Sequence, residues 1–214
     1  MMLERRTRSA IPTALILVLA ATVVEAGAAQ DVLTPERIVE RAIHVCDACH
    51  GEGGDSRKPD MPKLAGQPAI YLADQLRSFR AQKRSDSTAQ AYMWGISALL
   101  DENTIEGLAE YYETQQPTPG KPGKAAQMEI GRRIFEEGIP ARKVRPCTKC
   151  HGDDGEGESV FPRIAGQHAD YIVRQLKEFG TKLRPHGVIM AKRVVQPMNN
   201  EEMEAVAAYL QAKQ

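Results

Sequence analysis

The sequence predicts an all-α protein made of two tandem copies of one small domain. Segments of the first half recur in the second with a period of about one hundred residues, which is too long for a solenoid. Within each copy, apolar residues recur at the spacing of an amphipathic helix, and no segment alternates clearly as a β-strand does. A short segment rich in proline and glycine separates the copies.

The repeat covers several separate segments of the chain. Residues 61–67 (MPKLAGQ) recur as 161–167 (FPRIAGQ), and residues 105–111 (IEGLAEY) recur as 203–209 (MEAVAAY). Four further residues keep the same spacing: Tyr71, Gln75, Leu76 and Phe79 recur as Tyr171, Gln175, Leu176 and Phe179. Similarity over this length indicates two copies of a whole domain.

The helices can be placed in order along the chain. Thr34 is expected to cap a helix that begins at Pro35, because proline suits the first helical position. Ile38, Ala42 and Val45 follow at helical spacing. Further stripes of the same kind predict helices over residues 71–79, 105–112 and 203–210. Each domain is therefore expected to consist of a few short helices joined by loops that contain glycine and proline.

Composition also predicts the boundaries of the domains. Residues 117–124 (PTPGKPGK) cannot continue a helix and predict a linker, which its prolines should make extended and semi-rigid. We expect the first domain over residues 30–116 and the second over residues 125–214. Residues 1–29 are predicted to be a signal peptide.

The predicted signal peptide has the three regions that export requires. Arg5, Arg6 and Arg8 precede an apolar run over residues 10–24, which is short for a membrane span. Residues 26–28 (AGA) offer an A-x-A cleavage site. We expect the general secretion route, because no Phe-Leu pair follows the arginines. The alternative is an uncleaved segment that anchors the protein at the membrane.

One five-residue motif occurs in each copy. Residues 46–50 (CDACH) and 147–151 (CTKCH) both read C-x-x-C-H and use all four cysteines. This motif is the attachment signature of a c-type haem, in which two thiols bind the haem and the adjacent histidine binds the iron. The sequence thus predicts two covalently bound haem c groups, with thiols from Cys46, Cys49, Cys147 and Cys150 and iron ligands His50 and His151.

Other uses of the two cysteine pairs are less consistent with the sequence. A four-thiolate zinc site usually brings its pairs together across about 15–20 residues, far fewer than separate these two. Thioredoxin-like chemistry requires a βαβ context, whereas the flanking patterns are helical. Structural disulfides are a further alternative in an exported protein.

A methionine at the sixth iron position would raise the reduction potential and favour electron transfer. The repeat excludes most candidates. Met61 corresponds to Phe161, Met128 precedes the second motif, and Met198 and Met203 match apolar core positions.

Met93 and Met190 remain as the expected sixth ligands, each about ten residues before the last helix of its copy. Strict alignment pairs Met93 with Ala191, so we expect a one-residue insertion in the second loop. His186 competes with Met190 as the ligand of the second haem, and a bis-His haem would have a lower potential.

The remaining histidines, His44 and His168, are expected to be surface or packing residues. Arg84 and Arg184 occupy matching positions after the helix that contains the Tyr/Phe stripe. A guanidinium group binds carboxylates in bidentate fashion, so each arginine is a candidate partner of a haem propionate. The alternative is a solvated surface arginine.

Together these features resemble the cytochrome c4 family. Both halves contain C-x-x-C-H-G, a Pro-x-(Leu/Ile)-Ala-Gly-Gln stretch, a distal methionine and a closing Leu-Ala-x-Tyr-type helix, and the resemblance covers about residues 31–212. The Ala-Gly-Gln stretch is the more specific mark, because every c-type cytochrome has the haem motif. The resemblance implies two tandem class I cytochrome c domains, and a periplasmic diheme electron carrier that is often membrane-associated.

The resemblance also implies roles for individual residues. His50 and Met93 would bind the first iron, and His151 and Met190 the second. Carbonyl groups at two matching prolines, Pro62 and Pro162, would accept a hydrogen bond from the proximal histidines. The chain departs from the simplest family pattern at the Met190 loop and in residues 140–146, which are longer and more basic than their counterpart.

The charge of the two halves differs although the whole chain has a formal net charge of zero. Residues 30–116 contain 9 Lys and Arg against 14 Asp and Glu, whereas residues 117–214 contain 16 against 12. Such asymmetry orients diffusional encounters. We therefore expect the halves to face different redox partners. The alternatives are that the basic half contacts anionic lipid, or that the charges only maintain solubility.

Three functions are compatible with two haems. The leading hypothesis is an electron carrier, not an enzyme, between a quinol-oxidising complex or dehydrogenase and a terminal oxidase. The second is the diheme cytochrome subunit of a dehydrogenase, such as a sulfide-oxidising flavocytochrome. The third, a diheme peroxidase, would need one open iron position, which the two matched methionine candidates argue against. The sequence contains no basic patch with interleaved aromatic residues, which is the pattern that would suggest a nucleic-acid partner.

Overall fold

The structure is a computed structural model that describes residues 34–184 and 187–214. Within those ranges the regular secondary structure is helical, and β-type pairing is limited to two isolated bridges. The predicted all-α class is thereby confirmed. The predicted signal peptide and His186 lie outside the described residues, and both stay predictions.

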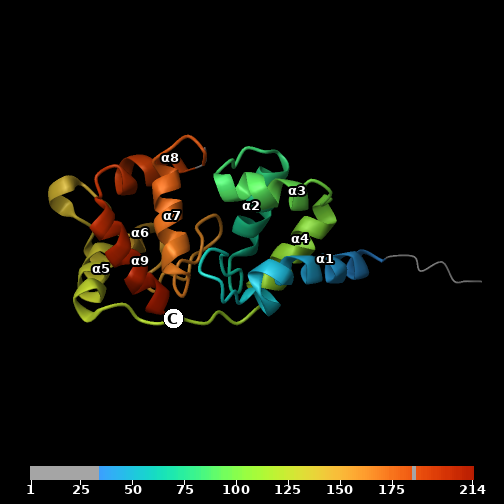
Figure 1. The fold of residues 1–214 in the computed structure, drawn as a ribbon, viewed down its shortest axis with the longest axis horizontal. Helices are drawn as coiled ribbons and strands as arrows, with labels where there is room; N and C mark the ends of the chain where they lie inside the picture. Colours follow the sequence, from blue (N-terminus) through green and yellow to red (C-terminus); the bar gives the residue numbers. More distant parts are fainter. Residues whose placement is uncertain (1–33, 185–186) are drawn as a thin grey trace, which may run out of the picture. The chain divides into compact units, whose positions relative to one another are not determined.

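The helices of the two halves follow one another along the chain (Figure 1). The first half contains α1 (Pro35–His50), α2 (Ala69–Arg80), α3 (Trp94–Ser97) and α4 (Glu102–Glu113). The second contains α5 (Ala125–Glu137), α6 (Thr148–His151), α7 (Ala169–Phe179), α8 (Val188–Met190) and α9 (Asn200–Ala212). Between them lie the 3₁₀ turns Glu52–Gly54 and Pro140–Arg142 and the π-helical turns Ala89–Met93 and Ala191–Val195.

The predicted start of the first helix is confirmed. The Thr34 hydroxyl accepts a hydrogen bond of 3.4 Å from the backbone N–H of Arg37, and Pro35 is the first helical residue. The helix then continues without interruption through the first C-x-x-C-H motif to His50, and the next residue, Gly51, has a φ of 80° that no other residue type adopts readily. The first haem motif is therefore held on the end of a sixteen-residue helix.

The second motif lies on a separate short helix, because residues 138–147 interrupt the helix that precedes it. The helix α5 ends at Gly138, which has a φ of 72°. A 3₁₀ turn and a bridge between Ile139 and Val144 follow, and the motif lies on the separate short helix α6. Pro140 and Pro146 each lack the N–H that an uninterrupted helix would need at these positions.

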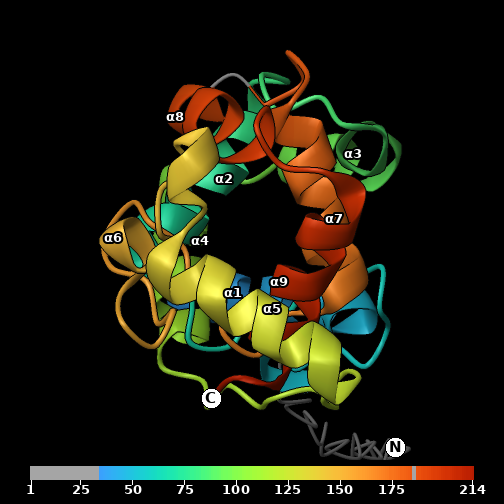
Figure 2. The ribbon, with the colours of Figure 1, turned by 90° about the vertical axis from the view of Figure 1, so that its left-hand side faces the viewer.

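Each half has its own hydrophobic core. One cluster combines residues of α2 and α4, and the other combines residues of α5, α7 and α9 with Met198 and Met203, which the sequence assigned to the core. The helices α5 and α9 lie side by side in both views (Figure 1, Figure 2). They approach so closely that a Cβ atom on Gly131 would be 2.1 Å from the carbonyl oxygen of Ala205.

The segment between α4 and α5 runs against both halves. Thr118 accepts a hydrogen bond of 2.7 Å from the Lys63 ammonium group through its carbonyl oxygen, and Gly120 donates one of 2.7 Å to the carbonyl of Gln211. Residues 117–124 contain no helix, as predicted. Their role as a boundary between two domains stays a prediction.

No helix in residues 34–184 or 187–214 is both long enough and apolar enough to cross a membrane.

Candidate haem sites

A cavity of about 920 Å³ is lined by residues from both halves of the chain. Its wall is mostly apolar and includes eight residues that the sequence placed around the two irons: Cys46, Cys49, His50, Met93, Cys147, Cys150, His151 and Met190. An apolar cavity of this kind, with two C-x-x-C-H motifs on its wall, fits two covalently held haem groups.

The cysteines are positioned by the helices that carry the motifs. Cys46 and Cys49 are three residues apart on α1, so both side chains lie on one face of the helix. None of the four cysteines is paired in a disulfide in the structure. Burial raises the pKa of Cys46 to about 11 and that of Cys147 to about 12. Burial therefore favours the uncharged form of both sulfur atoms over a thiolate.

The predicted hydrogen bonds between histidine and proline are present in both halves. The Nδ1 atom of His50 lies 2.8 Å from the carbonyl oxygen of Pro62, and that of His151 lies 2.8 Å from the carbonyl oxygen of Pro162. A carbonyl group only accepts, so each Nδ1 carries the proton and each Nε2 is left with its lone pair. Burial lowers the pKa of both histidines and favours this neutral form.

A loop closed by a backbone hydrogen bond brings each proline to its histidine. The backbone N–H of Leu64 donates to the carbonyl of Gly54, and that of Ile164 donates to the carbonyl of Gly155, each at 2.8 Å. Gly54 has a φ of 76°, and a Cβ there would be 2.8 Å from the Cβ of Leu64. Glycine is needed at this position for both its backbone conformation and its size.

Met93 and Met190 both end a short helical segment on the cavity wall. Met93 is the last residue of a π-helical turn, whereas Met190 precedes the π-helical turn Ala191–Val195. A π-helical turn takes up one extra residue, and this second turn lies where the sequence predicted a one-residue insertion. The two methionines stay the predicted sixth ligands.

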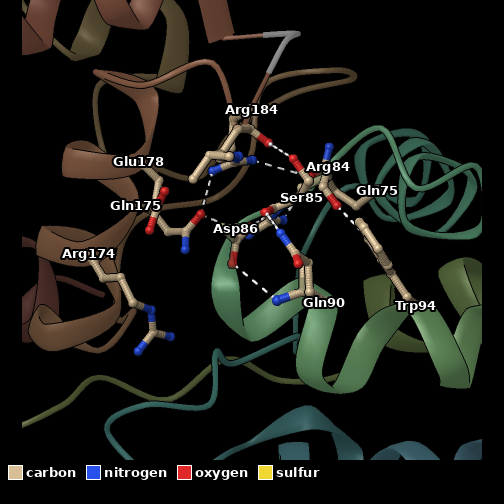
Figure 3. Close-up of polar contacts among 12 residues, drawn as sticks. Gln75, Arg84, Ser85, Asp86, Gln90, Trp94, Arg174, Gln175, Glu178 and Arg184 are labelled. Atoms are coloured by element: carbon tan, nitrogen blue, oxygen red, sulfur yellow. Dashed lines mark hydrogen bonds and ion pairs between the residues drawn. The ribbon is translucent and has the colours of Figure 1, made fainter.

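The arginines Arg84 and Arg184 lie in one polar network that joins the halves (Figure 3). Arg84 is only 6% exposed and donates to Gln75 and Gln175, each at 2.8 Å. Arg184 donates to the same two glutamines, at 3.2 Å and 2.8 Å respectively. A solvated surface role is therefore wrong for Arg84. Both arginines also line the cavity, and their binding to haem propionates stays a prediction.

The Arg84 charge has a buried counter-ion. Its Nε lies 3.0 Å from the carboxylate of Asp86, which is 2% exposed. The same carboxylate accepts a hydrogen bond of 3.2 Å from the backbone N–H of Ala89 and so caps the helical turn that leads to Met93.

Two further glutamines, to which the sequence analysis gave no role, hold the halves together. The Gln67 side chain binds the backbone of Arg163 through both its oxygen and its nitrogen, at 3.1 Å and 2.6 Å. The Gln167 side chain binds the backbone of Lys63 in the same way, at 2.9 Å for both contacts. Because 63 and 163, and 67 and 167, are matching positions of the repeat, the contact is self-complementary, like the interface of a two-fold dimer. The sequence feature that could have indicated this contact is the Ala-Gly-Gln stretch, which ends in Gln67 in one half and in Gln167 in the other.

His44 and His168 are not among the residues that line the cavity. His44 is exposed on α1. His168 is half-buried, and its Nε2 atom donates to the carbonyl oxygen of Ser56 at 2.8 Å. The predicted surface or packing roles are confirmed for both.

Comparison with known proteins identifies the family. Residues 128–213 match the cytochrome c family model. The chain is 37% identical over 194 residues to cytochrome c4 of Thiocapsa roseopersicina, which covers 86% of this chain and 95% of that protein. It is 38% identical over 182 residues to the thiosulfate dehydrogenase electron acceptor of Thiomonas intermedia, with 78% of each chain covered.

A solved structure of cytochrome c4 from Acidithiobacillus ferrooxidans superposes with a TM-score of 0.71, at 36% identity, over 78% of this chain and 97% of that one. The matched cavity side chains, the duplicated helices and these similarities agree, and the chain therefore belongs to the cytochrome c4 family, as a diheme electron carrier with two covalently attached haem c groups.

Proposed function

We propose that this cytochrome carries single electrons between a respiratory donor and a terminal oxidase or another acceptor in the periplasm. The observation that carries the proposal is the matched set of two thiols, one oriented histidine and one methionine that each half places on the cavity wall. Each haem, when bound, supplies a one-electron Fe(III)/Fe(II) couple.

The protein's own contribution is to hold each haem, to orient the histidine that binds its iron and to close the remaining iron position. The cysteines fix each haem covalently, and the proline carbonyls keep Nε2 of His50 and His151 available to the iron. The methionines would close the remaining position, which disfavours reactions with oxygen or peroxide. This arrangement supports a carrier over a peroxidase.

The donor is proposed to be a quinol-oxidising complex or a dehydrogenase. Similarity to the thiosulfate dehydrogenase electron acceptor of Thiomonas intermedia favours a dehydrogenase. A second function follows from the same similarity, in which the chain is the diheme partner of one particular dehydrogenase. Reduction of the purified protein by a thiosulfate dehydrogenase and thiosulfate, compared with reduction by a quinol-oxidising complex and quinol, would separate the two.

The unequal charge of the halves predicts how the rate of electron exchange depends on salt. Residues 30–116 have a formal net charge of −5 and residues 117–214 one of +4, so small charged reagents should sense the local charge of each half. Screening lengths fall from about 30 Å at 0.01 M salt to about 10 Å at 0.1 M. We expect reduction by cationic hexaammineruthenium(II) and by anionic Fe(II)-EDTA both to slow as salt is added.

Stopped-flow absorbance gives both rate constants on one holoprotein preparation. If the reagents sensed only the net charge of residues 30–214, which is −1, salt would leave both rate constants almost unchanged, and that result would contradict separate docking by the two halves. Rates that rise with salt for either reagent would contradict it as well.

A further inference from the structure

A single peptide group connects each proximal histidine to the opposite half. The carbonyl oxygen of Pro62 accepts from His50 at 2.8 Å, and the N–H of the same peptide group, which belongs to Lys63, donates to Oε1 of Gln167 at 2.9 Å. In a trans peptide the C=O and N–H groups point in opposite directions. The peptide group therefore joins the two hydrogen bonds end to end.

The second half contains the same connection in reverse. The carbonyl oxygen of Pro162 accepts from His151 at 2.8 Å, and the N–H of Arg163 donates to Oε1 of Gln67 at 3.1 Å. Each chain of hydrogen bonds thus begins at a glutamine in one half and ends at the histidine of the other half.

Both glutamines are held firmly enough to act on these peptide groups. Gln67 and Gln167 are only 6% and 5% exposed. Each also donates from Nε2 to the carbonyl oxygen of the residue whose N–H it accepts, at 2.6 Å and 2.9 Å. Hydrogen bonds in a buried chain polarise one another because the surroundings screen them weakly.

We propose that each of these glutamines tunes the axial histidine of the opposite half. Gln67 would act on His151, and Gln167 on His50. By accepting from the peptide N–H, the glutamine makes the proline oxygen a stronger acceptor and the imidazole a stronger donor to the iron. A more basic imidazole favours the oxidised haem and lowers its potential. The inference rests on the proposed function, in which these histidines are the proximal ligands.

The variants Q67L and Q167L test this assignment in the full holoprotein. Q67L should raise the midpoint potential of the second haem and leave that of the first unchanged, and Q167L should do the opposite. NMR of the reduced, diamagnetic protein provides a second readout. The Nδ1 proton of His151 should move to lower chemical shift in Q67L, as expected for a weaker hydrogen bond, while that of His50 keeps its position.

Two further variants separate tuning from general loosening of the interface. R174A removes another contact between the halves, from Arg174 to the carbonyl oxygen of Asp60 at 2.6 Å, and should move neither histidine proton. Q67E keeps an oxygen that accepts from Arg163 and should not reproduce the Q67L shift. Q67M replaces Q67L if the leucine variant does not fold.

The proposal requires that each glutamine substitution affects only the haem of the opposite half. Equal shifts at both haems, a shift at the haem of the mutated half, or the same shifts in R174A would overturn the proposal. A wild-type NMR spectrum without the two proximal histidine signals would instead overturn the proposed ligation itself, so the two failures can be told apart.

Discussion

Serine in place of both Cys147 and Cys150 is expected to leave a chain with one covalently bound haem instead of two. These cysteines supply both thiols of the second motif, and the first motif uses a separate pair on α1. A hydroxyl forms no thioether bond with a haem vinyl group. The haem content per chain, measured as the pyridine adduct after acid extraction of loosely bound haem, should therefore fall by half.

The second half should also lose stability in this variant. Its core cluster packs against Cys147 and Met190 on the cavity wall, and an apolar cavity without its covalent filler leaves that wall poorly packed. The matched control is T148A/K149A, which changes the two residues between the cysteines and should keep two haems. Two covalent haems in the serine variant would contradict the assignment of the second site.

The second large effect is expected from D86A. Asp86 and Arg84 are 2% and 6% exposed, and their charged atoms lie 3.0 Å apart at the interface of the halves. Removing one partner of a buried ion pair leaves the other charge uncompensated, which costs about 3–5 kcal/mol. The free energy of unfolding in urea should fall by about that amount.

An exposed ion pair provides the control for D86A. Glu102 pairs with Arg77 and Arg80 at the surface, where ion pairs contribute little because water and salt screen them. E102A should therefore cost much less stability than D86A, and R84M/D86A should recover part of the loss by removing both charges. Equal losses for D86A and E102A would show that the Arg84–Asp86 pair does not stabilise the interface.

Local features of the sequence predicted most of the fold. The Thr34 cap and the four helices read from apolar spacing are present, and each depends on a residue type at a fixed short distance along the chain. The contacts between the proximal histidines and the prolines, which the family resemblance implied, are also present. A repeat strengthens such predictions because each pattern can be checked in the other copy.

Contacts between the halves could not be predicted in the same way. Gln67 binds the backbone of Arg163, 96 residues away, and Arg84 binds Gln175, 91 residues away. Apolar periodicity shows which face of a helix is buried but not what covers it, and a polar residue such as Arg84 reads as a surface residue. In the sequence, the interruption between α5 and α6 appeared only as a longer and more basic segment. Its geometry depends on the backbone conformations around Gly138 and Pro140, which the sequence pattern does not specify.

The central claim is that both halves hold a haem with histidine and methionine as iron ligands. A spectroelectrochemical titration of the purified holoprotein tests it most directly. We predict two one-electron transitions at high potential, each accompanied by loss of the weak far-red absorption band of a ferric haem with these ligands. A transition at much lower potential without that band would contradict the account, because Met93 or Met190 would then not be an iron ligand.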